Sequence, residues 1–339
     1  MTPAATPAVT PDGPTAVARV TGPADLTAAI PELLGFVPAE SLVVLSLHEP
    51  RGRVGLTMRF DLAEARVLAR EVPVRLRHER ATRAVLAVWT DEPGPLPRAG
   101  LVHGVVESVE AAGIEVTAAL LVRDGTWWSY TCTGECCPAQ GLPVAGTRTG
   151  AAGLMAAERV LRGDVLRASR AELEQAMGCR LPLGEAVRCR ELDEAALALL
   201  DDIATDRCRT QEREVARLRK ALGADGRLSA DDAARCAVAL RLVSVRDEVL
   251  TWVGDSAPAV RHLALALCRW TPDRDVVPTL VVLGAAAYAE GGGATARLAL
   301  ERALRLDPAC TMAGLLLQAL DGQVPPGQVR DILRPPARR

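Results

Sequence analysis

Three cysteines that lie close together in the chain are its clearest candidates for chemistry. Cys132, Cys136 and Cys137 fall within the segment WWSYTCTGECCPAQGLPV, residues 127–144, whose glycine and proline residues favour a turn. Thiolates are good ligands for zinc, which takes four ligands in a tetrahedron. Because ligand pairs in zinc sites are usually separated by about two to four residues, the spacing of Cys132 and Cys136 suits zinc. We expect these two residues to be the ligands if the segment holds a metal.

The third cysteine and the missing fourth ligand leave other interpretations open. Adjacent residues such as Cys136 and Cys137 rarely bind one ion together, and no histidine lies near them in the sequence. A fourth ligand would come from Cys179, from Cys189 or from a remote histidine. The thiols could instead carry out redox chemistry, in which a stabilised thiolate is oxidised and its neighbour resolves it. Glu135 disfavours this chemistry, because a nearby negative charge raises the pKa of a thiol.

A structural role for the same segment is a further alternative. Trp127 and Tyr130 offer large areas for burial, and Ser129 and Tyr130 could hydrogen-bond to the loop. The segment would then pack the helical half onto the sheet. Binding or catalysis with a small ligand is the remaining possibility, without a substrate that the sequence can name. The candidate site residues are therefore Trp127, Ser129, Tyr130, Cys132, Cys136, Cys137 and Pro138.

Composition and charge argue against several functional classes. The formal net charge is −2, so the chain lacks the basic surplus that is typical of nucleic-acid binding. The first residues lack the basic and then apolar pattern of a signal peptide, and the most apolar later segment, residues 276–289, is too short to span a membrane. Nine cysteines without an export signal favour reduced thiols. We expect a cytoplasmic protein that does not contact a membrane, and the sequence gives no indication of nucleic-acid binding.

The first half of the chain alternates between strand and helix patterns. After a disordered lead-in over residues 1–23, we expect an α/β domain over residues 24–147 that ends in the cysteine loop. Apolar runs and alternation predict strands at 41–47, 54–60, 84–89, 116–122 and 127–131, and helical spacing predicts helices at 24–34, 62–76 and 99–112. Gly113 suits a helix end, and Asp124 with Gly125 is a type I′ hairpin signal. The order β-β-α-β-α-β-β predicts a mixed sheet with packed helices.

The second half is rich in alanine and leucine at helical spacing, which predicts an all-helical domain over residues 148–322 and a disordered tail over 323–339. Ser229 resembles an N-cap, and Arg213 and Arg217 suggest a solvated helix face. The expected helices are 151–161, 170–177, 193–222, 230–242, 245–253, 257–270, 277–289, 295–306 and 311–320.

One stretch of the helical half, residues 280–308, resembles a single tetratricopeptide repeat. The matching positions are Leu283, Gly284, Ala296, Leu300, Ala303 and Pro308. Small residues allow two antiparallel helices to approach closely, and the proline ends the second helix. Because one repeat cannot form a solenoid, the stretch is either a helical hairpin in the core or a groove for a partner segment.

Two segments together resemble a known family. These are LLGFVPAESLVVL, residues 33–45, and the cysteine segment, residues 127–144. The chain resembles the actinobacterial domain of unknown function 4192 family over most of its length. The resemblance implies an α/β half that leads through a cysteine-rich turn into helices, and it implies no activity.

The sequence supports two hypotheses about function. The first is a non-enzymatic binding or scaffold protein that contacts a protein partner through its helical half and the tetratricopeptide-like hairpin. The alternative is a cysteine-dependent metal-binding or redox protein, or an enzyme, centred on Cys132, Cys136 and Cys137, with zinc as the possible cofactor. Phosphate-loop, HExxH, GxSxG and GxGxxG motifs are absent from the sequence.

Overall fold

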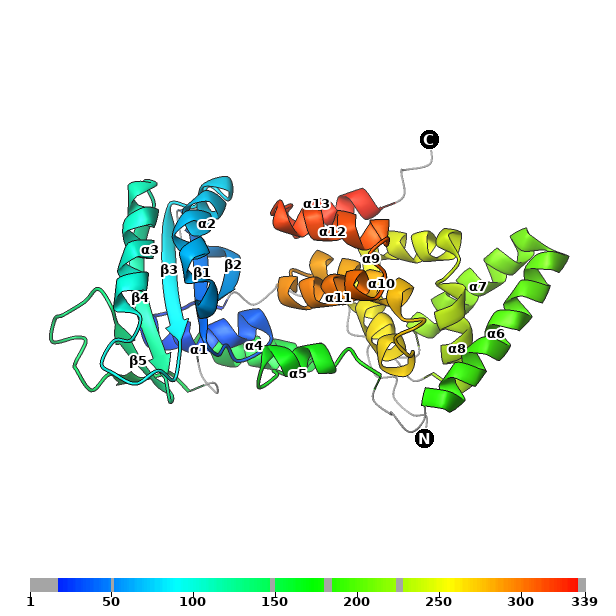
Figure 1. Cartoon of the computed structure of the whole chain (residues 1–339), viewed down its shortest axis with the longest axis horizontal. Helices are drawn as coiled ribbons and strands as arrows, with labels where there is room; N and C mark the ends of the chain where they lie inside the picture. The colour runs from blue at the N-terminus through cyan, green and yellow to red at the C-terminus, as the bar shows by residue number, and fades with distance from the viewer. Residues whose placement is uncertain (1–17, 50–51, 147–149, 180–184, 224–227, 335–339) are drawn as a thin grey trace, which may run out of the picture.

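The protein consists of an α/β half and a helical half that lie side by side (Figure 1). The computed structural model describes residues 18–49, 52–146, 150–179, 185–223 and 228–334. It confirms the mixed sheet with packed helices and the helical part that follows. Among these residues, no helix is both long and apolar enough to cross a membrane.

A six-stranded sheet forms the centre of the α/β half. Its strands are β1 (Ser41–His48), β2 (Arg53–Asp61), β3 (Arg83–Trp89), β4 (Glu115–Arg123), β5 (Thr126–Ser129) and β6 (Leu142–Pro143). They lie in the order β2-β1-β3-β4-β5-β6, in which β3 and β4 are parallel and the other neighbours are antiparallel. The predicted element order is confirmed. The sequence missed β6, because a pair of residues is too short to show a periodic pattern.

Helices cover both faces of this sheet. α1 (Pro23–Leu34) packs against the face that carries Val43, whereas α2 (Ala65–His78) and α3 (Ala99–Ala111) pack against the face that carries Leu42. Successive strand residues point to opposite faces, so a strand that is covered on both sides must be apolar throughout. This explains the continuous apolar run of β1.

The connections follow the backbone preferences of their residues. Gly113 ends α3 with a φ of 81°, and Asp124 and Gly125 join β4 to β5 with φ values of 50° and 69°. Two successive positive φ values are what a type I′ turn requires. The residues predicted to begin the second helix instead form a short 3-10 helix, η1 (Leu62–Glu64), before α2.

The remaining helices follow the cysteine loop. They are α4 (Gly150–Leu161), α5 (Arg170–Gln175), α6 (Glu185–Thr205), α7 (Arg207–Leu222), α8 (Ala230–Ala239), α9 (Val243–Trp270), α10 (Val277–Ala289), α11 (Gly293–Leu306), α12 (Thr311–Asp321) and α13 (Pro326–Leu333).

Of two predicted helix boundaries in this half, the structure contradicts the first and confirms the second. The single helix expected over residues 193–222 is two helices, α6 and α7, because Asp206 leaves the helical conformation and its side chain accepts a hydrogen bond from the Arg209 N–H. The separate helices expected at 245–253 and 257–270 are confirmed as the two arms of α9, because Ser256 (φ −139°) leaves the helical conformation and kinks the helix between them.

α10 is the central helix of the helical half. Every residue from Thr279 to Ala289 is buried, so neighbouring elements surround the helix. A Cβ added at Gly284 would lie 2.7 Å from the side chain of Leu300, which shows how closely α10 and α11 approach. These two helices therefore pack as a hairpin within the core.

The end of the chain differs from the expected disordered tail. α13 packs Val329, which is 4% exposed, into a cluster with Tyr288. The hydroxyl of Tyr288 also shares its one hydrogen between the carbonyl oxygens of Ala319 (2.9 Å) and Val324 (2.7 Å). The greater part of the expected lead-in, residues 1–17, and the expected boundary between residues 147 and 148 lie outside the described residues.

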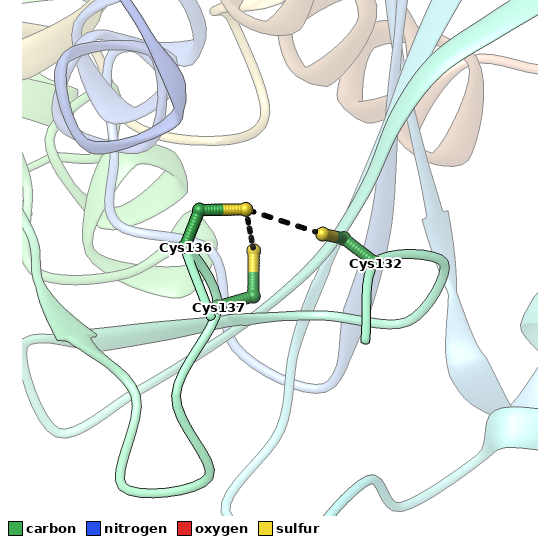
Figure 2. A group of neighbouring side chains, drawn as sticks. All are labelled: Cys132, Cys136 and Cys137. Atoms are coloured by element: carbon green, nitrogen blue, oxygen red, sulfur yellow. Dashed lines mark hydrogen bonds between the residues drawn. The ribbon is translucent and has the colours of Figure 1, made fainter. Parts of the chain in front are cut away.

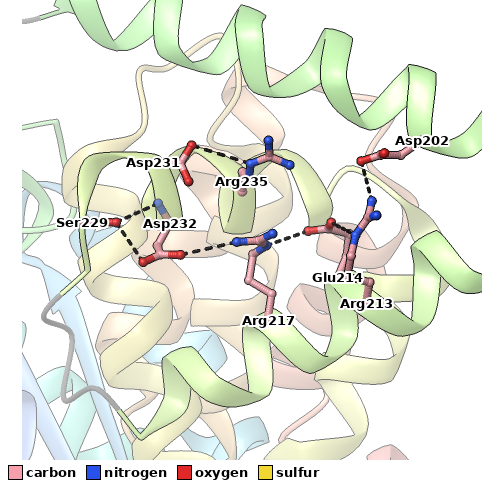
Figure 3. Close-up of polar contacts among 8 residues, drawn as sticks. All are labelled: Asp202, Arg213, Glu214, Arg217, Ser229, Asp231, Asp232 and Arg235. Atoms are coloured by element: carbon pink, nitrogen blue, oxygen red, sulfur yellow. Dashed lines mark hydrogen bonds and ion pairs between the residues drawn. The ribbon is translucent and has the colours of Figure 1, made fainter.

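Polar residues of α7 and α8 form a network between the helices (Figure 3). The buried carboxylate of Glu214 accepts hydrogen bonds from Nε of Arg213 (3.3 Å) and Nε of Arg217 (3.1 Å). Ser229 caps α8 as predicted, because its Oγ accepts a hydrogen bond from the Asp232 N–H at 3.1 Å. The two arginines therefore neutralise a buried charge, in addition to forming the solvated face that we expected.

α4 lies against the first helix of the α/β half. Ala152 of α4 is buried against Ala28 and Ala29 of α1. Farther along, Phe36 and Arg167 form a parallel β-bridge. The first helix after the cysteine loop therefore packs on the α/β half, although its composition resembles that of the helical half.

Candidate functional site

The cysteine loop connects β5 to β6. β5, from which the loop begins, is anchored by side chains on both faces of the sheet. Trp127 is buried in the core beneath α1, and Tyr130 is buried on the opposite side with α2 and α3. The Tyr130 hydroxyl donates a hydrogen bond to the Pro97 carbonyl oxygen (2.7 Å), and burial raises the pKa of Tyr130. The hydroxyl of Tyr130 therefore binds the α/β half and not the loop, contrary to our expectation.

Ser129 starts the loop by capping it, as the sequence predicts. Its Oγ accepts hydrogen bonds from the N–H groups of Thr131 (3.2 Å) and Cys132 (2.9 Å). A second turn forms where the Cys137 N–H donates to the carbonyl oxygen of Gly134 (2.9 Å). The two turns reverse the chain and bring its cysteines together.

Trp128 and Gly141 hold the far end of the loop. The indole N–H of Trp128 donates to the carbonyl oxygen of Ala139 (3.1 Å), and the guanidinium of Arg123 lies 5.2 Å from the ring centre. Gly141 has a φ of 76°, and a Cβ at this position would lie 2.5 Å from the Trp128 ring. The Gly141 N–H donates to the carbonyl oxygen of Pro138 (2.8 Å), which gives the candidate residue Pro138 a backbone role.

The three sulfur atoms of the loop converge (Figure 2). Sγ of Cys136 lies 3.5 Å from Sγ of Cys132 and 4.0 Å from Sγ of Cys137, and all three atoms lie within 4.8 Å of one another. A tetrahedral zinc ion with Zn–S bonds of about 2.3 Å holds its sulfur ligands about 3.8 Å apart. The observed spacing matches that of ligands to one ion. Cys137 joins the expected pair because the turn directs both adjacent side chains to the same side.

The loop shifts the pKa values of its cysteines in opposite directions. A backbone hydrogen bond from Gly134, followed by hydrogen bonds with Cys136 and Cys137, lowers the pKa of Cys132. Burial, followed by hydrogen bonds with the neighbouring sulfur atoms, raises the pKa of Cys137 to about 12. Cys132 therefore loses its proton before Cys137 does, and hydrogen bonds from the neighbouring thiols stabilise the resulting thiolate. The sequence could not predict that the backbone of Gly134 lowers the pKa of Cys132, because the glycine indicates only a turn.

Among the described residues, the group consists of three potential ligands. Within the part of the chain that the structure describes, no other cysteine, histidine or carboxylate joins it. Cys179, one expected fourth ligand, accepts a hydrogen bond from Nη1 of Arg188 (3.3 Å) in the helical half, and Cys189 belongs to α6. Three protein ligands and an open position are the arrangement of catalytic zinc, whereas structural zinc takes four protein ligands.

The fold and the loop together define a two-part protein, in which a thiol-rich turn links a mixed sheet to a helical half. The chain belongs to the family described as a domain of unknown function (DUF4192), whose family model matches residues 23–327. No curated protein and no solved structure matches the chain. The resemblance inferred from the sequence is confirmed.

Proposed function

We propose that the protein binds a zinc ion through Cys132, Cys136 and Cys137 and leaves one coordination position open. The observation that carries the proposal is the spacing of the three sulfur atoms, which lie within 4.8 Å of one another. One disulfide would use only two of the three thiols in the loop. The separations of all three sulfur atoms suit ligands around one soft ion.

The thiols would bind the ion in a defined order. Cys132 supplies a thiolate before Cys137 does, because the pKa of Cys132 is lowered. The pKa of Cys137 is raised to about 12, so this thiol ionises only when a cation lies beside it. Binding therefore releases protons, and the apparent affinity for zinc rises with pH. The open position takes a water molecule or an external ligand, and bound zinc lowers the pKa of such a water.

Native mass spectrometry of the full chain, purified under reducing conditions and given a small excess of Zn²⁺, tests the proposal. We expect one bound ion in the natural chain and none in the Cys132→Ser or Cys136→Ser variants. The matched control is Cys208→Ser, which removes an exposed thiol on α7 and should keep the ion.

Two results would contradict the zinc proposal. One is a natural chain that stays free of metal, and the other is a Cys132→Ser variant that binds zinc as the natural chain does. A metal-free natural chain that is lighter by two hydrogens, with the disulfide located at Cys132 and Cys136 by peptide mapping, would favour the redox alternative.

A contact surface on the helical half is the second candidate function. Leu197 and Leu200 of α6 are 64% and 62% exposed, and residues three positions apart lie on the same face of a helix. Because α10 is enclosed by its neighbours, α6 supports a protein contact better than the tetratricopeptide-like hairpin does. A partner captured by the natural chain from its native cytoplasm, but lost with Leu197→Ser and Leu200→Ser combined, would support this function. Equal capture by both chains would contradict it. The cytoplasmic location and the actinobacterial origin stay predictions.

A further inference from the structure

A second candidate site is a cleft between the two halves, which none of the three loop cysteines lines. Its volume is about 760 Å³, which falls within the range of small-molecule sites. Residues of α1, α4 and α5 line one side, and residues of α9, α10 and α11 line the other. Clefts between domains are frequent places for small ligands to bind.

Positive charge dominates the polar lining of this cleft. The described lining contains the five arginines Arg159, Arg162, Arg167, Arg261 and Arg269, but only the three carboxylates of Glu32, Asp164 and Glu290. The lining itself has two more arginines than carboxylates, and Glu158 and Glu172, which pair with Arg162 and Arg167, are not part of it. The cleft therefore favours an anionic ligand.

Arg261 forms the fixed part of the site. Its Nη1 donates to Asp164 (2.7 Å), its Nε donates to Glu290 (3.0 Å), and its Nη2 lies 3.1 Å from Nε2 of His262. The Arg261 side chain is 8% exposed. These bonds use all three nitrogens of the guanidinium, so Arg261 holds α9, α10 and the segment after α4 together.

Other arginines keep donors available. Arg159 uses Nε and Nη2 to bind Glu32, which leaves its Nη1 without a partner among the described residues. Nη1 of Arg167 lies 3.6 Å from Glu172, beyond hydrogen-bond distance. Arg162 pairs with Glu158 through Nη2, and its side chain is 48% exposed. A guanidinium has five N–H donors, so these three arginines can bind an anionic group together.

Exposed aliphatic side chains lie beside these donors. Leu161 and Val165 line the cleft and are 87% and 62% exposed, which is unusual for large apolar residues. Met155 and Leu265 extend the aliphatic lining. Apart from the imidazole of His262, the described lining contains no aromatic ring on which a nucleobase could stack. An aliphatic group suits these contacts better than a planar one.

We propose that this cleft binds an organic anion that carries a phosphate or carboxylate group on an aliphatic chain. The anionic group binds Arg159, Arg162 and Arg167, and the aliphatic chain covers Leu161 and Val165. This site is independent of the zinc proposal, because it shares no residue with the cysteine loop.

Isothermal titration calorimetry of the full chain with decyl phosphate, decanoate and decanol, each below its micelle concentration, tests the proposal. We expect decyl phosphate to bind, and decanol to bind at least about tenfold more weakly, because it lacks the charge. Combining Arg162→Gln with Arg167→Gln should weaken decyl phosphate binding at least about tenfold. Arg235→Gln is the matched control, because Arg235 pairs with Asp231 four residues away, as Arg162 pairs with Glu158, and lies outside the cleft.

Circular dichroism verifies that each variant is folded. Because the cleft is independent of the cysteine loop, the Cys132→Ser variant should bind decyl phosphate as the natural chain does. Tighter binding of decyl phosphate than of decanoate would assign a phosphate to the ligand, and the reverse order would assign a carboxylate. The proposal is overturned if neither anion binds at millimolar concentration, if decanol binds equally well, or if the paired arginine substitutions leave binding unchanged.

Discussion

Replacing Gly141 with alanine should loosen the cysteine loop without altering any sulfur atom. The left-handed conformation of Gly141, with a φ of 76°, costs an L-residue about 1 kcal/mol. The new Cβ would also lie 2.5 Å from Cε2 of Trp128 and 2.6 Å from Cγ2 of Thr126. Since real Cβ atoms do not approach other atoms so closely, the indole ring must move.

Movement of the indole disrupts two further interactions. The hydrogen bond from Trp128 to the Ala139 carbonyl oxygen contributes about 1 kcal/mol. The contact between the ring and Arg123 contributes about 0.5 kcal/mol. Together with the backbone cost at Gly141, these effects predict a loss of about 2 to 3 kcal/mol in the stability of the loop.

Gly134→Ala is the matched control in the same loop. A Cβ there would meet Sγ of Cys136 at 3.6 Å and Sγ of Cys132 at 3.8 Å, which are ordinary contacts, and the backbone φ of Gly134 is not positive. We expect this variant to change stability by less than about 0.5 kcal/mol.

Hydrogen–deuterium exchange of peptides that cover residues 126–143 measures this prediction, because a loop can open without global unfolding. Gly141→Ala should speed exchange about 30-fold or more and should also lower zinc occupancy, whereas Gly134→Ala should do neither. Equal exchange in the two variants would refute the reasoning that Gly141 and Trp128 hold the cysteines together.

Two further predictions concern the thiols and the join between the halves. The pKa of Cys132 is lowered and that of Cys137 is raised to about 12, so Cys132 should react with iodoacetamide at lower pH than Cys137 in the metal-free chain. Peptide mass spectrometry at several pH values measures the order of reaction. The reverse order would contradict the prediction. Replacing Arg261 with methionine should lower the free energy of unfolding by about 3 kcal/mol, because Glu290 would keep a buried charge without its partner. Arg235→Met, in which an exposed ion pair is lost, should cost less than about 1 kcal/mol in the same urea titration.

The candidate site was predictable in its residues but not in its geometry. Ser129 caps the loop as a serine at the start of a turn should, and the glycine and proline content indicated a reversal of the chain. The sequence did not predict that Cys137 joins Cys132 and Cys136, because the direction of adjacent side chains depends on the backbone angles of the loop. It also assigned the wrong partner to Tyr130, which binds a carbonyl oxygen 33 residues away.

The sequence by itself determined the features that depend on neighbouring residues. The apolar run of β1 predicted a strand covered on both faces, and Gly113, Asp124 and Gly125 predicted their own backbone conformations. In each case the cause is local, either the alternation of side chains along a strand or the conformational freedom of a turn residue.

The tertiary structure alone decided which distant residues meet. It placed α4 on α1, buried Glu214 between two arginines and packed Val329 against the core. It also left Leu161 exposed in a cleft whose arginines come from α4, from the segment between α4 and α5, and from α9. Burial and ion pairing depend on contacts between segments that are far apart in the chain, and hydrophobic periodicity reports only the face that a segment buries, not the segment against which it packs.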